Sequence, residues 1–75
     1  MSTEYAQKEL DRLRREIKRH QTRHEEVRDT LDTGFLSKED QETLRKELRV
    51  LNRMLRDKRA RIEALEQEME DDSNT

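Results

Sequence analysis

Two histidines, His20 and His24, are the residues of this 75-residue sequence best suited to metal chemistry. A spacing of four residues brings two imidazoles to the same face of a helix, an arrangement that zinc sites use for a pair of ligands. Two ligands do not complete a tetrahedral site, and the sequence has neither a cysteine nor a third histidine. A metal ion would need ligands from a second chain, so we predict no metal site and no cofactor within the chain itself.

The other reactive residue types do not form a catalytic centre. Without cysteine there is no thiol nucleophile, and no serine or carboxylate is spaced to form a proton relay with either histidine. The single glycine, Gly34, excludes a glycine-rich phosphate-binding loop. A sequence with 28% hydrophobic residues also has too little apolar material for a buried small-molecule pocket. We expect a protein that is not an enzyme, with no catalytic residues and no small-molecule ligand.

Arginine offers a different chemistry, the recognition of anions. The sequence contains 12 arginines and 5 lysines. The planar guanidinium group fits the oxygens of phosphate and carboxylate groups better than an ammonium group does. The arginines in two rows with helical spacing are candidates for binding a nucleic-acid backbone or another anion: Arg12, Arg15, Arg19, Arg23, Arg45, Arg49, Arg53 and Arg56. The alternatives are contact with the acidic end of another copy, and a solvated helix surface that binds nothing.

The charges are segregated along the chain even though the net charge is only −2. Residues 8–23 carry seven basic and three acidic side chains, residues 45–61 carry eight and two, and the rest of the chain sums to −12. If the two basic stretches lie side by side, they form a basic belt between two acidic ends. Both aromatic residues, Tyr5 and Phe35, lie outside this belt, so nucleic-acid binding there would involve the phosphate backbone and would weaken strongly with salt.

Heptad spacing predicts the elements that position these side chains. In both halves of the chain, mostly apolar residues recur at alternating steps of three and four, which is the pattern of a coiled-coil seam. The seam positions of the first half are Ala6, Leu10, Leu13, Ile17, His20, His24, Val27 and Leu31. Those of the second half are Leu44, Leu48, Leu51, Leu55, Lys58, Ile62, Leu65 and Met69. Two helices that share one apolar seam are therefore expected.

A short break separates the two seams. Gly34 suits the left-handed conformation that ends a helix, and Phe35 is expected to make the apolar contact that often accompanies it. Ser37 is expected to cap the second helix. The predicted elements are a helix over 3–32, a turn at 33–37, a helix over 38–71 and a disordered acidic tail at 72–75, all in a single domain spanning 1–75. Because the connection is short, the helices are neighbours, and the predicted fold is an all-α, antiparallel two-helix hairpin of the coiled-coil type.

Charges beside the seam indicate its register. In heptad notation the seam residues occupy positions a and d, and in an antiparallel pair the g positions of the two helices face each other on one flank and the e positions on the other. The opposing g residues have opposite charges: Glu9 with Arg61 and Arg23 with Glu47. The opposing e residues have like charges: Arg14 with Arg59 and Arg28 with Arg45. We predict matched charges on the first flank and a basic stripe on the second.

A lone hairpin of this composition has a small apolar core, so we expect it to associate into a larger helical bundle, with itself or with a partner helix. Val50 and Met54 lie just outside the strict seam and widen the apolar face of the second helix. The residues predicted for partner contact are Leu10, Leu13, Ile17, Val27, Leu31, Leu44, Leu48, Val50, Leu51, Met54, Leu55, Ile62 and Leu65.

The principal functional expectation is therefore a protein–protein interaction or oligomerisation module. The alternative is a hairpin that binds the backbone of RNA or DNA through its arginines. The absence of cysteine and of a long apolar run favours a soluble, intracellular protein with no membrane partner.

The seam histidines have two further interpretations that involve no metal. A polar layer of His20 and His24 would lower the stability of the coiled coil but fix which residues pair. Alternatively the layer is a pH switch, because charging two imidazoles on an apolar stripe is unfavourable, and helicity or association would fall as the pH drops through about 6. Lys58, at another seam position, is expected to extend its ammonium group to the surface and to help fix the register.

Two families resemble this chain. Its architecture resembles that of the Rop-type RNA-binding helical hairpins, which dimerise into four-helix bundles, although no motif matches residue by residue. It is also similar to the N-terminal antiparallel coiled coil of hantaviral nucleoproteins in its Met1-Ser2-Thr3 start, its Arg15-Glu16-Ile17 stretch followed by His20, and its turn near residue 34. The second resemblance covers a handful of residues. Together the two resemblances imply a hairpin that binds RNA or assembles a nucleoprotein.

Overall fold

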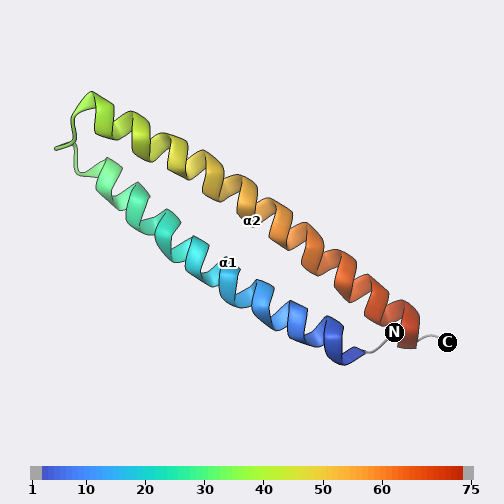
Figure 1. Cartoon of the computed structure of the whole chain (residues 1–75). Helices are drawn as coiled ribbons and strands as arrows, with labels where there is room; N and C mark the ends of the chain where they lie inside the picture. The colour runs from blue at the N-terminus through green and yellow to red at the C-terminus, as the bar shows by residue number, and fades with distance from the viewer. Residues whose placement is uncertain (1–2, 74–75) are drawn as a thin grey trace.

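The computed structural model is a helical hairpin (Figure 1). Helix α1 spans Thr3–Asp32 and helix α2 spans Lys38–Ser73, and the two helices run antiparallel, side by side. The structure describes the backbone of residues 3–73 and the side chains of residues 3–70. The hairpin is a rod that measures 57 × 15 × 14 Å. The predicted all-α antiparallel hairpin is confirmed.

The break between the helices has the predicted local chemistry, with one exception. Gly34 has a φ of 75°, a conformation that glycine adopts without a steric penalty, and α1 ends just before it. The backbone N–H of Asp40 donates to Ser37 Oγ at 3.1 Å, which is an N-cap of α2. The predicted cap contact of Phe35 is wrong, because the side chain is 93% exposed. The next residue, Leu36, is half-buried in its place.

Helix α2 continues farther than predicted. We expected it to end at about residue 71, and Asp72 and Ser73 also belong to the helix and not to the disordered tail predicted for 72–75. The sequence has no glycine or proline after Gly34, so no residue stops the helix at position 71. Asn74 and Thr75, the remainder of the predicted tail, lie outside the described residues.

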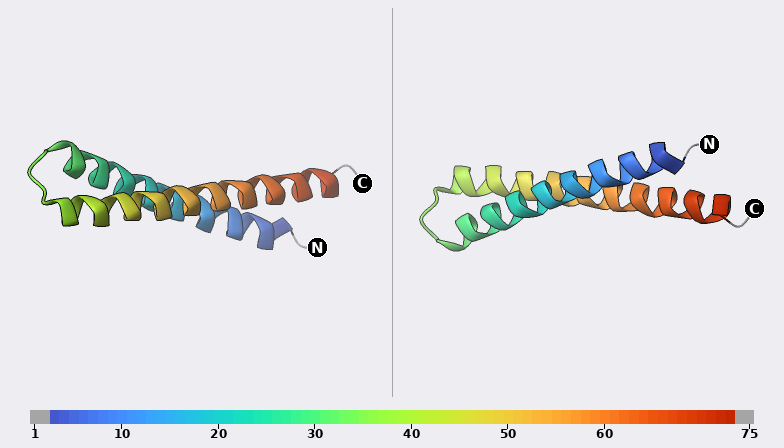
Figure 2. Two further views of the ribbon diagram at one scale, coloured as in Figure 1. Left: turned by 90° about the horizontal axis from the view of Figure 1, so that it is seen from above. Right: turned by 90° about the horizontal axis from the view of Figure 1, so that it is seen from below.

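The core is a narrow seam between the two helices. Its buried side chains are Leu10, Leu13, Val27, Leu51, Leu55 and Leu65. Toward the open end of the hairpin, Leu10 and Leu13 pack with Leu65, and Ala6, Ile62 and Met69 pack against this cluster. Figure 2 shows that the helices cross as they run along each other, which is the arrangement that keeps a heptad seam facing its partner.

Burial along the seam is incomplete. Of the residues predicted for partner contact, the half-buried ones are Ile17, Leu31, Leu44, Leu48, Met54 and Ile62, while Val50 is 52% exposed. Residues 14–26 of α1 include no buried side chain, since His20 and His24 occupy two of the seam positions there. Helix α1 therefore contributes little apolar packing in the middle of the hairpin.

Charged side chains recur in every turn of both helices. Within the described residues, neither helix contains an apolar stretch long enough to cross a lipid bilayer.

Candidate functional site

Two edges flank the seam, and they differ in charge. We call the flank formed by the g positions and the adjoining c positions the paired edge, and the flank formed by the e and b positions the basic edge. In the middle of the hairpin, residues 12–28 and 45–61, the paired edge has four cations and four anions: Arg12, Glu16, Arg19, Arg23, Glu26, Glu47, Asp57 and Arg61. The basic edge has seven cations and one anion: Arg14, Lys18, Glu25, Arg28, Arg45, Arg49, Arg56 and Arg59.

Ion pairs between the helices join the two sides of the paired edge. Arg23 binds Glu47 with two hydrogen bonds, from Nε to Oε1 at 2.8 Å and from Nη2 to Oε2 at 3.0 Å. Glu9 Oε1 lies 3.5 Å from Arg61 Nε. Both pairs are the ones that the g positions predict, so the predicted register is confirmed.

A third pair on this edge involves a seam residue. Lys58 Nζ donates to Glu16 Oε2 at 2.5 Å, so the ammonium group leaves the seam as expected. The partner, Glu16, was not predicted. Arg12 Nε lies 3.8 Å from the other oxygen of the same carboxylate. Glu16 therefore connects a cation of its own helix with a cation of α2.

These cations hold the carboxylates of the paired edge in their charged form. The hydrogen bond from Lys58 lowers the pKa of Glu16 below its ordinary value of 4.5. The hydrogen bonds from Arg23 lower the pKa of Glu47 in the same way, and the Glu47 carboxylate raises the pKa of the Arg23 guanidinium group. Because the pairs are partly exposed, they add little to stability, and their main effect is to fix the register.

The basic edge has a single ion pair among the described residues, near the open end of the hairpin. Arg14 Nη2 lies 3.2 Å from Glu66 Oε1, so the charge of Arg14 is balanced and is not left opposite Arg59. The other six cations of this edge are exposed and make no ion pair with a described residue: Lys18, Arg28, Arg45, Arg49, Arg56 and Arg59.

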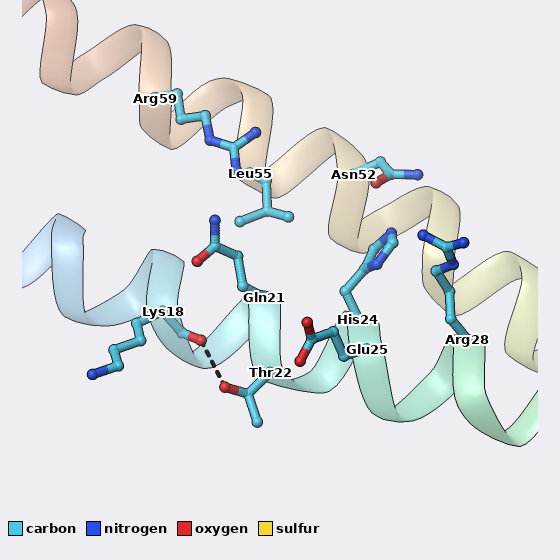
Figure 3. A pocket seen from close by; sticks show the side chains of 9 residues that line it. All are labelled: Lys18, Gln21, Thr22, His24, Glu25, Arg28, Asn52, Leu55 and Arg59. Atoms are coloured by element: carbon cyan, nitrogen blue, oxygen red, sulfur yellow. Dashed lines mark hydrogen bonds between the residues drawn. The ribbon is translucent and has the colours of Figure 1, made fainter.

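A hollow opens on the basic edge beside the middle of the seam (Figure 3). Its lining residues are Lys18, Gln21, Thr22, His24, Glu25, Arg28, Asn52, Leu55 and Arg59. Gln21 and His24 of α1 point toward α2, and Arg28 and Arg59 flank the hollow from opposite helices. The hollow forms because polar side chains stand between the helices here, where long apolar side chains would fill the space.

The arginines predicted to bind an anion do not share one surface. Arg45, Arg49 and Arg56 lie on the basic edge, while Arg15 and Arg53 occupy f positions on the outer faces. The remaining three, Arg12, Arg19 and Arg23, lie on the paired edge. There, Arg12 and Arg23 already pair with carboxylates. The arginines of the predicted belt are thus distributed around the whole circumference of the hairpin and do not form one binding surface.

Of the six basic-edge cations that make no ion pair with a described residue, three were missing from the predicted set: Lys18, Arg28 and Arg59. The like charges at opposing e positions could have identified Arg28 and Arg59 as cations of this edge. Lys18 could have been identified from its b position, which adjoins the e positions on the same flank.

The two histidines have different surroundings. Both are half-buried, and neither makes a hydrogen bond with a described residue. His24, at an a position, lines the hollow of the basic edge, whereas a d position such as that of His20 adjoins the paired edge. No group of three side chains able to hold a metal ion occurs among the described residues. The pH dependence expected of the histidines stays a prediction.

No protein-family model matches the sequence, and no curated protein or solved structure is significantly similar to it.

Proposed function

We propose that this chain is a non-enzymatic oligomerisation module in which two copies of the hairpin associate through their paired edges. The observation that supports the proposal is the apolar pair Val50 and Met54 in the middle of that edge. Val50 is 52% exposed, Met54 is half-buried, and the α1 residue at the g position opposite Met54 is the charged Glu16. Two uncovered apolar side chains one helical turn apart are a typical contact for a further helix.

The charges of the paired edge suit contact with a second copy. The four cations and four anions in its middle are interspersed, and they cancel. In a two-fold symmetric dimer one surface meets itself, so a neutral edge of mixed charge can place unlike charges opposite each other. The basic edge, with seven cations and one anion, would repel another basic edge. The paired edge is therefore the surface that a second copy would cover.

The limited burial of the hairpin favours association as well. Six side chains are buried among the described residues, and ten of the sixteen seam positions are only half-buried. Helical proteins of this size usually need more burial than one narrow seam provides. A four-helix dimer would cover Val50, Met54 and part of the half-buried seam.

The test is the mass of the chain as a function of concentration, measured by sedimentation equilibrium. We expect a monomer–dimer equilibrium for the wild type and a shift toward monomer for the Val50→Glu/Met54→Glu variant, because both new carboxylates would be buried in the contact. The matched control is Ala60→Glu/Gln67→Glu, which adds the same charge at exposed f positions away from both edges. The control should dimerise as tightly as the wild type.

A wild-type chain that is fully helical and monomeric at high micromolar concentration contradicts the proposal. So does a Val50→Glu/Met54→Glu variant that dimerises as tightly as the control. Far-UV circular dichroism at the same concentrations separates loss of association from loss of fold. If helicity and dimer are lost together in this variant and not in the control, association also stabilises the fold, as the limited burial predicts.

A further inference from the structure

We infer that the basic edge binds the phosphate backbone of a double-stranded nucleic acid. Six exposed cations on this edge have no carboxylate partner among the described residues: Lys18, Arg28, Arg45, Arg49, Arg56 and Arg59. Like charges gathered on one side of a small fold repel one another. A bound polyanion relieves that repulsion.

The chain contains enough carboxylates to pair with all of its cations. The sequence has 19 acidic residues and 17 basic ones. Over the same length of hairpin, Arg12, Arg23 and Arg61 of the paired edge each lie within 3.7 Å of a carboxylate oxygen. The carboxylates are thus placed to neutralise one edge and not the other, and the anion that neutralises the basic edge comes from outside the hairpin.

The length of the edge matches a run of backbone phosphates. Arg45, Arg49, Arg56 and Arg59 follow one flank of α2, and the rise of an α-helix gives them a span of about 21 Å. A duplex has one phosphate per about 1.7 Å of its axis when both strands are counted, so an edge of this length lies beside several backbone phosphates. Repeated charge along a line suits a regular polyanion better than a single small anion.

The hollow adds hydrogen-bonding groups between the cations of the two helices. Arg28 of α1 and Arg59 of α2 stand on opposite sides of it, and Gln21, His24 and Asn52 lie between them (Figure 3). The side-chain amides and the imidazole can donate hydrogen bonds to phosphate oxygens. Cationic groups and neutral hydrogen-bond donors are therefore both available to phosphate oxygens on this edge.

The residue types favour the backbone of a duplex over the bases of a single strand. Single-strand binding normally relies on aromatic side chains that stack on bases. Tyr5, at a c position, and Phe35, in the turn, are the only aromatic residues of the sequence, and neither lies on the basic edge. Five of the six cations are arginines, whose planar group matches phosphate oxygens. Binding should therefore be independent of sequence and strongly dependent on salt.

This inference does not depend on the proposed dimer. The two edges lie on opposite flanks of the seam, so a second copy on the paired edge leaves the basic edge open. A dimer would present two basic edges, and its affinity for a long duplex would exceed that of one hairpin.

The test is fluorescence anisotropy of the full chain with labelled duplex DNA and duplex RNA of mixed sequence. We expect binding at about 50 mM salt that weakens about 500-fold by about 200 mM, since about five phosphate contacts give a slope near −4.5 for log K against log salt concentration. The Arg45→Gln/Arg49→Gln/Arg56→Gln/Arg59→Gln variant should lose most of this affinity, and its salt slope should shrink by about 3 to 4.

The matched control is Arg15→Gln/Arg19→Gln/Lys46→Gln/Arg53→Gln. It removes four exposed cations that make no ion pair with a described residue and that lie off the basic edge. We expect it to lose less than about 10-fold in affinity, through the weaker long-range attraction alone. Glutamine is a good helix former, so both variants should keep the far-UV circular dichroism of the wild type.

Absence of binding at about 50 mM salt overturns the inference, because phosphate contacts are strong at that ionic strength. An equal loss of affinity in the two variants overturns it as well, since the binding would then not be located on the basic edge. If the basic-edge variant keeps its nucleic-acid affinity but loses self-association, the edge binds the acidic end of a second copy instead. Nucleic-acid binding by Val50→Glu/Met54→Glu that loses only the gain from the second basic edge of the dimer, together with loss of the dimer, supports two separate surfaces.

Discussion

Glu16 and Glu47 each accept a hydrogen bond from a cation of the other helix, Lys58 in the first case and Arg23 in the second. Exposed pairs of this kind contribute little to the stability of a protein at neutral pH. Their effect on the surface is larger, because they neutralise the paired edge, whereas six cations of the basic edge have no carboxylate partner among the described residues. Which carboxylate pairs with which cation thus decides where an outside anion can bind.

We predict that these two carboxylates make the hairpin sensitive to acid. Their pKa values are lowered in the folded chain, so their contribution to stability is complete above the ordinary glutamate value of 4.5. It is lost as the pH falls below that value and through the lowered pKa values of the folded state, because the unfolded chain then binds protons more readily. Thermal unfolding followed by circular dichroism between about pH 7 and about pH 3 measures this loss.

The Glu16→Gln/Glu47→Gln variant should show a smaller acid-induced fall in Tm than the wild type. Glu63→Gln/Glu68→Gln is the matched control, since it removes two exposed glutamates that make no ion pair with a described residue. The control should retain the wild-type dependence on pH. The prediction fails if the wild type and the Glu16→Gln/Glu47→Gln variant lose the same stability in acid.

At the scale of the helices, α1 and α2 bring different residues to the seam. Helix α2 provides leucine at most of its seam positions, whereas α1 has His20 and His24 in the middle. Neighbouring seam positions in a heptad adjoin opposite flanks. His24 therefore belongs to the hollow of the basic edge, and His20 lies beside the paired edge. Substitution of the two residues should have different consequences.

We predict that His20→Leu strengthens self-association and that His24→Leu does not. Leucine at position 20 would extend the apolar surface of Val50 and Met54, whereas leucine at position 24 would fill the hollow on the other flank. Both variants should gain thermal stability, since half-burial of a leucine side chain is worth about 1 kcal/mol. Sedimentation equilibrium and thermal unfolding of the two single variants, each serving as the control for the other, make the comparison. Equal strengthening of the dimer by both would contradict their assignment to different edges.

The elements and the register could be predicted because their signals are local or simply periodic. Heptad spacing gives the helices, and a lone glycine followed by a capping serine gives the turn. The pairs of Lys58 with Glu16 and of Arg14 with Glu66 were missed, since a register rule compares only residues directly opposite each other. Long side chains reach a neighbouring turn or leave the seam, and sequence spacing does not reveal which of these they do.

The candidate site was harder to predict than the fold. Rows of arginines at helical spacing describe one helix at a time, whereas the availability of a cation depends on the carboxylates of the other helix. Arg23 belongs to such a row and is engaged by Glu47, while Arg59 lies outside the rows and has no partner among the described residues. In the turn, two apolar residues are adjacent in the sequence, and the structure shows that Leu36 and not Phe35 is the half-buried one.

At the scale of the whole molecule, the charges give the rod two different flanks as well as acidic ends. The net charge of −2 conceals both features. A dimer formed through the paired edges would lie side by side and keep the length of one hairpin, 57 Å. A dimer held by the attraction between an acidic end and a basic edge would be staggered, and therefore longer. The overall dimensions of the dimer distinguish these two kinds of contact.

We predict that the dimer is about as long as the monomer. The hairpin has a radius of gyration of 17.0 Å, and its length accounts for most of that value. A second hairpin packed alongside at a helix-packing distance of about 10 Å raises the radius only to about 18 Å, whereas a stagger of half a length raises it to about 23 Å. Small-angle X-ray scattering at concentrations where the mass is that of a dimer measures this radius.

High salt distinguishes the two kinds of contact as well. It should leave the radius of gyration of a paired-edge dimer unchanged, because that contact is centred on Val50 and Met54. It should dissociate a dimer that is held together by opposite net charges. A dimer with a radius near 23 Å that dissociates in salt would show that the acidic ends and the basic edge, not the paired edges, hold the copies together.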